Sequence, residues 1–297
     1  MASATTDILE RVRRAAIGAV AYGDVFGYPL DAGEVHRYLH GVSASSAVTT
    51  SALERAVGGP LSYRDGCYTL HGREELVAQR HSRADHARKL WPVAIRYGRL
   101  IATLPFVKMV AVTGSLAWNN VEPGGDIDYL VVTEPDRLWS CHWMIAVLTE
   151  TVRRAGVPLC PNYLISERAL ELHDRNLYTA YELAQMKPIA GYATYRRMRE
   201  LNRWSDDFLP NTAPLQPVVD AASIPFAGVS RLVEHALRTK IGAKLEQFEM
   251  HYRIRKWTRI GAESSETEYG VDCCKAHTSA HKTKILAALA ERIRGLE

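Results

Sequence analysis

The sequence predicts an α/β protein with a small mixed sheet at its centre, a helical N-terminal module that ends in a hairpin, and an all-helical C-terminal region. Two short runs rich in β-branched residues, at 110–113 and 127–133, have the composition and bounding turn residues of buried strands. Apolar residues at helical spacing dominate both ends of the chain. At 297 residues, of which 47% are hydrophobic, the chain can bury a core and carry additional modules.

Residues 1–72 are expected to form a module of three helices and a β-hairpin. Asp31, followed three residues later by Glu34, has the pattern of a capping box and predicts a helix start. A third helix is expected at 48–57, and 61–70 has two short strand-like runs around an Arg-Asp-Gly turn. This order of elements resembles a winged-helix domain.

The candidate recognition helix of this winged-helix-like module contains one cation, Arg55. A helix that binds DNA normally presents several cations to the phosphates. We therefore favour a packing or dimerisation role for the module over DNA binding.

The rest of the chain divides into three regions. Residues 73–104 are a helical connector, in which Pro92 is expected to mark a break or a new helix start. Residues 105–170 contain the strands of the core. Residues 171–297 are predicted to be all helical, with one long helix over 229–257.

The segment between the two strand-like runs is the most informative part of the sequence. Gly114 lacks a Cβ, so a phosphate group can approach the backbone, and Ser115 can open a helix and offer its hydroxyl and N–H group. Asp126 and Asp128 are two residues apart on a strand and therefore point to the same face. Because adjacent carboxylates repel each other, the pair predicts a divalent cation, and hard oxygen ligands suit Mg²⁺. A helix-capping serine followed by turn carboxylates is the alternative.

In type and spacing, Gly114, Ser115, Asp126 and Asp128 resemble the signature of the polymerase-β-type nucleotidyltransferase superfamily. That signature is a hydrophobic strand, then Gly-Ser, and, after a spacer of about ten residues, Asp-hydrophobic-Asp. The wider pattern is similar to bacterial nucleotidyltransferase-like proteins with an N-terminal winged-helix-like module. The resemblance implies a small mixed-sheet nucleotidyltransferase core in which the two aspartates hold two Mg²⁺ ions. It also implies that Gly114 and Ser115 cradle the β- and γ-phosphates of an NTP, by default ATP.

A third carboxylate is commonly supplied in that superfamily by a later strand, and the residue best placed here is Asn162, on a strand expected at 158–166. Asparagine can ligate a metal through its carbonyl group but cannot act as a base. This departure leaves the proton acceptor unassigned and keeps an inactive pseudo-enzyme as an alternative. Glu182, on a helix expected at 176–187, could supply the carboxylate if its face meets the site; a surface glutamate is the alternative.

A second cluster of chemically versatile side chains lies near the C-terminus: Cys273, Cys274, Lys275, His277 and His281. If this segment is helical, the two histidines share a face beside Lys275. Our preferred interpretation is a phosphate or acceptor site, with Lys275 as a point charge and His281 as the proton acceptor. A zinc site is a second interpretation, although adjacent cysteines are awkward ligands for one ion, and ordinary surface histidines are a third.

Composition limits the location and partners of the protein. The formal net charge of +4 permits contact with ATP or nucleic acid without implying either. No apolar run approaches the roughly 20 residues of a membrane span, and the first residues lack the apolar core of a signal peptide. The five cysteines are odd in number and have no disulfide-framework spacing. We therefore expect a cytoplasmic protein with no membrane partner.

The expected activity is Mg²⁺-dependent transfer of a nucleoside monophosphate, by default AMP from ATP, to a hydroxyl-type acceptor with release of pyrophosphate. A small-molecule acceptor is favoured over tRNA or a protein. The alternative from another class is a non-catalytic regulator that senses a nucleotide and binds DNA, and nucleic acid is not the favoured partner.

Overall fold

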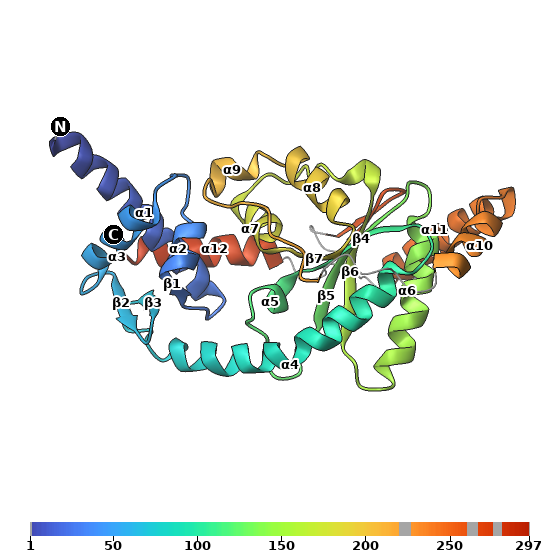
Figure 1. Cartoon of the computed structure of the whole chain (residues 1–297), viewed down its shortest axis with the longest axis horizontal. Coiled ribbons are helices and arrows are strands. Elements are labelled where there is room, and N and C mark those ends of the chain that lie inside the picture. The colour runs from blue at the N-terminus through green and yellow to red at the C-terminus, as the bar shows by residue number, and fades with distance from the viewer. Residues whose placement is uncertain (1, 220–226, 260–266, 276–280, 297) are drawn as a thin grey trace.

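The computed structural model describes residues 2–219, 227–259, 267–275 and 281–296. A helical N-terminal part lies at one end of the molecule, a six-stranded sheet lies in the middle, and the helix of residues 227–237 lies at the other end (Figure 1). The structure therefore confirms the predicted α/β class with a mixed sheet. Within the described residues, no helix has the length and apolar character needed to cross a membrane.

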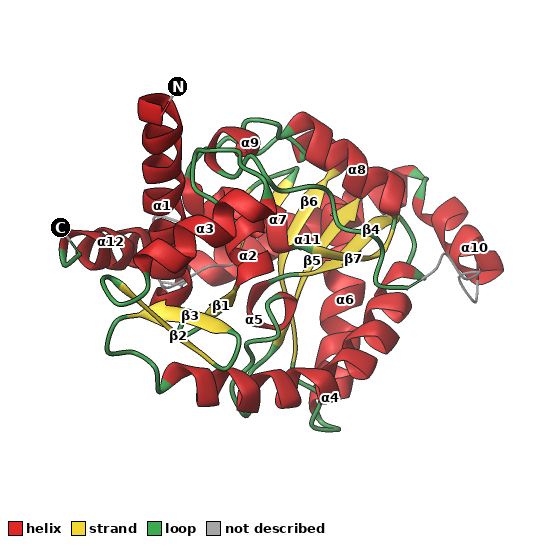
Figure 2. Ribbon diagram, turned by 60° about the vertical axis from the view of Figure 1, so that its left-hand side comes forward, coloured by secondary structure: helices red, strands yellow, loops and turns green. Residues whose placement is uncertain are grey.

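The N-terminal part has the predicted order of three helices and a hairpin. Its elements are α1 (Ala2–Val25), β1 (Leu30–Asp31), α2 (Ala32–Arg37), α3 (Ser46–Ala56), β2 (Leu61–Arg64) and β3 (Cys67–Leu70). The capping box is confirmed, because the Asp31 carboxylate accepts from the Glu34 N–H group at 2.9 Å and the Glu34 carboxylate accepts from the Asp31 N–H group at 2.9 Å. The hairpin pairs with β1 in a small sheet of order β1-β3-β2, which lies apart from the large sheet (Figure 2).

The large sheet has the strand order β7-β4-β5-β6-β9-β8. Its centre is β4 (Val107–Val112), β5 (Ile127–Thr133) and β6 (Leu159–Ser166); β4 is antiparallel to β5, and β5 is parallel to β6. Parallel neighbours need a crossover, and α6 (Leu138–Arg153) provides it. Side chains that alternate along β4 and β5 enter two different apolar clusters, so both faces are covered. This burial explains why both strands appear in the sequence as continuous apolar runs.

The prediction of an all-helical C-terminal region is wrong. Three short strands of this region complete the sheet: β7 (Lys187–Ala190), β8 (Glu268–Tyr269) and β9 (Cys273–Lys275). β7 pairs with β4, and β9 pairs with β6, both antiparallel. Strands of two to four residues are too short for a period of two to emerge from the sequence, and they exist because longer strands offer them an edge.

The helices differ from expectation at two places. The helix α4 (Leu76–Ala102) continues through Pro92, which was expected to mark a break, and spans from the small sheet to the large one (Figure 2). The long helix predicted over 229–257 is two helices, α10 (Ala227–Leu237) and α11 (Lys240–Arg259). A Cβ on Gly242 would lie 1.8 Å from the Leu237 carbonyl oxygen, so a glycine is needed for the tight turn between them.

The remaining α-helices are α5 (Gly114–Ala117), α7 (Leu177–Gln185), α8 (Tyr192–Leu201), α9 (Ser205–Phe208) and α12 (His281–Arg294). α12 packs on α1, and Ile285 and Leu289 of α12 share an apolar cluster with the N-terminal helices and with Tyr181 of α7. Residues 1–72 therefore share their core with elements from the C-terminal region.

Candidate active site

The glycine turn predicted at the end of the first strand is present, and its geometry depends on Asp128. Gly114 has a φ of +62°, in the left-handed region that favours glycine. A Cβ at this position would lie 2.3 Å from Oδ2 of Asp128, so the aspartate carboxylate occupies the space that a side chain would need. The turn opens into α5, a helix of a single turn, whose exposed Ser115 faces the adjoining cavity.

The two aspartates lie at the start of β5. Asp126 is exposed and immediately precedes the strand, whereas Asp128 is half-buried within it. Burial, and then the negative charge of Asp126, raise the pKa of Asp128 to about 6. Mutual repulsion of this kind is the physical reason to expect a counter-cation at the pair.

Asn162 lies next to Asp128, because β6 runs parallel to β5. The Asn162 side-chain amide donates to Oδ1 of Asp128 at 2.9 Å. It thereby orients one carboxylate oxygen and lowers the pKa of Asp128 against the effect of burial. Cys160, which sequence reasoning did not single out, is in register with Asp128, and burial beside the aspartates raises the pKa of its thiol to about 12.

A cavity of about 1090 Å³ opens beside these residues. Eight of the residues considered in the sequence analysis line it: Gly114, Ser115, Asp128, Asn162, Glu182, Cys273, Lys275 and His281. Asp126 is not among the lining residues, and its connection to the site is its charge beside Asp128. We call Gly114, Ser115, Asp128 and Asn162 the cavity floor.

Other lining residues of the cavity come from distant parts of the sequence. We call Tyr22 and Phe26 of α1, Glu182 of α7, Lys275 of β9 and His281 of α12 the cavity wall. The N-terminal part therefore helps to enclose the site. Apolar spacing along helices cannot predict which helix faces meet across such a space.

Glu182 brings a further carboxylate to the cavity. Burial, and then the charge of Asp128, raise its pKa to about 7, while Lys275 has the opposite effect. Its Oε1 accepts from the Gln185 side-chain amide at 2.8 Å. The helix face that sequence analysis left open is thus turned toward the site, and a carboxyl group that titrates near neutral pH can accept and release a proton.

Lys275 and His281 both line the cavity, but they do not come from one helix. Lys275 lies on β9, with its Nζ 5.4 Å from the centre of the Tyr163 ring, and His281 begins α12. His277, the other histidine of that prediction, lies outside the described residues. The exposed His281 ring lies near two aromatic rings, 6.5 Å from Phe26 and 6.1 Å from Tyr178 between centroids. Lys275 is in a strand and not in a helix because β9 pairs with the edge of β6.

The zinc interpretation of the C-terminal cluster does not fit the structure. Successive residues of a strand face opposite sides, and Cys273 and Cys274 enter different apolar clusters on the two faces of the sheet. Burial raises the pKa of both thiols, to about 12 for Cys274, which disfavours the thiolates that bind zinc. These two cysteines cannot ligate one ion.

The aspartate pair differs in chemistry from a zinc site. In the described part of the chain, no three or more His, Cys, Asp or Glu side chains are grouped so as to hold a metal ion. Mg²⁺ is commonly held by one or two carboxylates together with substrate phosphates. The carboxylates of Asp126 and Asp128, with the elevated pKa of Asp128 beside the Gly114 turn, fit an ion that arrives with a phosphate chain.

Comparisons of the chain with protein-family models, with curated proteins and with solved structures found no match.

Proposed function

We propose that this protein is a Mg²⁺-dependent nucleotidyltransferase with a core of the polymerase-β type and an N-terminal winged-helix-like module. The observation that carries the proposal is the contact between the Gly114 turn and the Asp128 carboxylate, where a Cβ would come within 2.3 Å of Oδ2. This contact joins a backbone turn suited to phosphates with a carboxylate suited to a metal. A helix-capping serine and two turn acids, the alternative for this motif, would not require such proximity.

In the proposed reaction, an acceptor hydroxyl oxygen attacks the α-phosphorus of an NTP, by default ATP. The bond from that phosphorus to the oxygen bridging to the β-phosphate breaks, and pyrophosphate leaves. Asp126 and Asp128 would hold two Mg²⁺ ions, and Gly114 and Ser115 would orient the β- and γ-phosphates. When bound there, Mg²⁺ would lower the pKa of the acceptor hydroxyl and neutralise charge on the leaving pyrophosphate.

The proton of the acceptor hydroxyl needs a base, and two residues of the cavity wall are candidates. His281 is the candidate from the sequence, and Glu182 is the one that the structure adds. Glu182 interacts electrostatically with Asp128 and has a pKa of about 7, whereas His281 lies among aromatic rings. We therefore propose Glu182 as the proton acceptor and Lys275 as a phosphate or acceptor contact.

The size of the cavity supports a small-molecule acceptor. Pockets for one small ligand usually measure roughly 300–1,000 Å³. A cavity of about 1090 Å³ leaves room for an acceptor beside the nucleotide. tRNA or a protein remains the alternative acceptor. A DNA-binding regulator is disfavoured, because Arg55 is the one cation of α3.

We also propose a cytoplasmic location, supported by five cysteines that are all free thiols.

The test is Mg²⁺-dependent binding of ATP by the full chain, measured by calorimetry, together with pyrophosphate release in a small-molecule extract. Wild-type protein should bind ATP with Mg²⁺ and lose binding with a chelator, and Asp126→Asn or Asp128→Asn should abolish the dependence. Asp85→Asn is the matched control, because Asp85 is an exposed aspartate paired with Arg88 on α4. Equal binding by wild-type protein and both site variants would overturn the proposal.

A further inference from the structure

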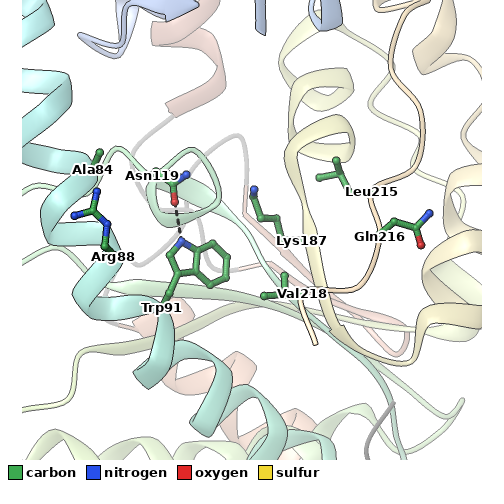
Figure 3. Close-up of a pocket in the computed structure, with 8 residues that line it drawn as sticks. All are labelled: Ala84, Arg88, Trp91, Asn119, Lys187, Leu215, Gln216 and Val218. Atoms are coloured by element: carbon green, nitrogen blue, oxygen red, sulfur yellow. Dashed lines mark hydrogen bonds between the residues drawn. The ribbon is translucent and has the colours of Figure 1, made fainter. Parts of the chain in front are cut away.

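A second cavity, of about 530 Å³, lies on the other side of the loop that follows α5. It opens to the surface between α4, β7 and the segment 215–218, and its lining residues are Ala84, Arg88, Trp91, Asn119, Lys187, Leu215, Gln216 and Val218 (Figure 3). None of these residues has a role in the proposed reaction. Asn119 lines this cavity and its neighbour Asn120 lines the first one, so the loop separates the two.

The Trp91 ring is held in a fixed orientation at this cavity. Its Nε1 donates to Oδ1 of Asn119 at 2.7 Å (Figure 3). Asn119 in turn has a φ of +55°, and its N–H group donates to the Leu116 carbonyl at 3.0 Å, which closes the loop. A ring whose polar edge is already bonded presents its apolar surface to a ligand at little cost in side-chain entropy.

Lys187 provides a positive charge beside this ring. Its Nζ lies 5.8 Å from the centre of the Trp91 ring. Burial, and then the positive charge of Arg37, lower the pKa of Lys187. Among the ion pairs of the described residues none involves Lys187, whereas Arg88 is paired with Asp85 at 2.8 Å. The charge of Glu34 raises the pKa of Lys187, but by less than burial and Arg37 lower it, so an anion that enters the cavity stabilises this half-buried ammonium.

We propose that this second cavity binds a small planar aromatic compound with one anionic group. The ring lies against Trp91 and is flanked by the apolar side chains of Leu215 and Val218, and the anionic group contacts Lys187. The described residues of the lining include no acidic side chain, and the volume of the cavity is in the range of small-ligand sites. This site is independent of the proposed nucleotidyl transfer.

The experiment is a titration of the full chain with four probes, measured by calorimetry and ligand-observed NMR. Phenyl phosphate and benzoate carry both a ring and an anion, inorganic phosphate carries only the anion, and phenol carries only the ring. We expect phenyl phosphate or benzoate to bind at least about tenfold more tightly than inorganic phosphate and phenol, since stacking and charge pairing act together. The stronger of the two ring anions identifies whether the natural ligand is a phosphate or a carboxylate.

Three variants locate the site. Lys187→Met should weaken binding of the ring anion about tenfold or more and leave phenol unchanged, and Lys187→Arg should restore binding to within about threefold. Lys89→Met, a lysine of α4 outside the lining, is the matched control and should bind as wild type does.

Three results would overturn the proposal. The first is inorganic phosphate binding as tightly as the ring anions. The second is wild-type affinity in Lys187→Met. The third is loss of binding in Asp128→Asn, which would place the ligand in the first cavity. If Lys187→Met is unfolded by circular dichroism, Lys187→Arg and the ranking of the four probes on wild-type protein decide the question.

Discussion

The cavity floor and the cavity wall face the same space, but they are assembled in different ways. The floor comes from β4, β5 and β6 and the turns between them, within one continuous part of the chain. The wall combines α1, α7, β9 and α12, which lie far apart in the sequence. A local motif can therefore identify the floor, whereas only tertiary packing determines the wall.

The largest expected effect tests the floor. Asp128→Asn removes the charge of a proposed metal ligand and should lower the rate of the proposed nucleotidyl transfer by about 10⁴-fold or more. The variant should fold, because its neutral amide relieves the repulsion with Asp126. Steady-state pyrophosphate release and circular dichroism would measure both properties, and unchanged turnover would contradict the role of the floor.

The next prediction tests which residue of the cavity wall accepts the proton of the acceptor hydroxyl. Glu182→Gln should lower kcat by roughly 10²–10⁴-fold with little change in nucleotide affinity, as loss of a general base does. It should also remove an ionisation near pH 7 from the rate profile, since the pKa of Glu182 is about 7.

His281→Ala is the paired variant. If it shows the larger loss of kcat while Glu182→Gln is active, the histidine is the base, as the sequence suggested. If both variants keep wild-type kinetics and Asn162→Ala is inactive, the wall supplies no base and Asn162 is a metal ligand itself.

When no cation is present, the raised pKa of Asp128 in the cavity floor should make the stability of the protein depend on pH. The pKa of Asp128 is raised to about 6 by burial and by Asp126, above the unfolded value of about 3.9, so the folded state holds the proton more tightly. The free energy of unfolding should therefore fall as pH rises from about 4 to about 6, by up to about 2–3 kcal/mol. Denaturation with a chelator across this range should show the decline in wild-type protein and not in Asp128→Asn. The same pH dependence of stability in wild-type protein and in Asp128→Asn would contradict this prediction.

A smaller effect tests how the wall is held together. Nε of Arg292 on α12 donates to Oδ2 of Asp24 at 2.6 Å, and Nε of Arg73 donates to Oδ1 at 3.1 Å, while Asp24 is only 5% exposed. Arg292→Met leaves Asp24 with one arginine and should cost about 1–3 kcal/mol of stability. Arg294→Met is the control, because Arg294 bonds a carbonyl of its own helix. Equal unfolding midpoints would show that the pair does not hold α12.

The smallest effect concerns the N-terminal part, which contributes Tyr22 and Phe26 to the wall. Arg55→Gln should change DNA affinity little, because one cation gives no more than weak, salt-sensitive binding in the range of roughly 10⁻⁴–10⁻⁶ M. A gel shift with the full chain would measure it. If wild-type protein binds DNA tightly and sequence-specifically and Arg55→Gln does not, the N-terminal part recognises DNA.

Residues near one another in sequence made the centre of the fold predictable. The strand expected at 127–133 is β5, the hairpin and the capping box are present, and Gly114 adopts the conformation that only glycine takes readily. Such features depend on local backbone geometry and on apolar runs. They place Gly114 against Asp128 without knowledge of the rest of the chain.

The parts that were missed depend on distant partners. β9 is a strand because β6 offers it an edge, so Lys275 and His281 do not share a helix. Glu182 enters the site because α7 packs between the sheet and the N-terminal helices. The sequence around Glu182 contains no signal that distinguishes this placement from an exposed one.

The hydrogen bond between Asp24 and Arg292 joins residues 268 positions apart. Contacts of such long range form late, because closing a long loop costs entropy before any packing is gained. The strands of the floor have nearer partners and can pair first. We therefore expect the glycine turn and both aspartates to be in place during folding before the space beside them is closed to water.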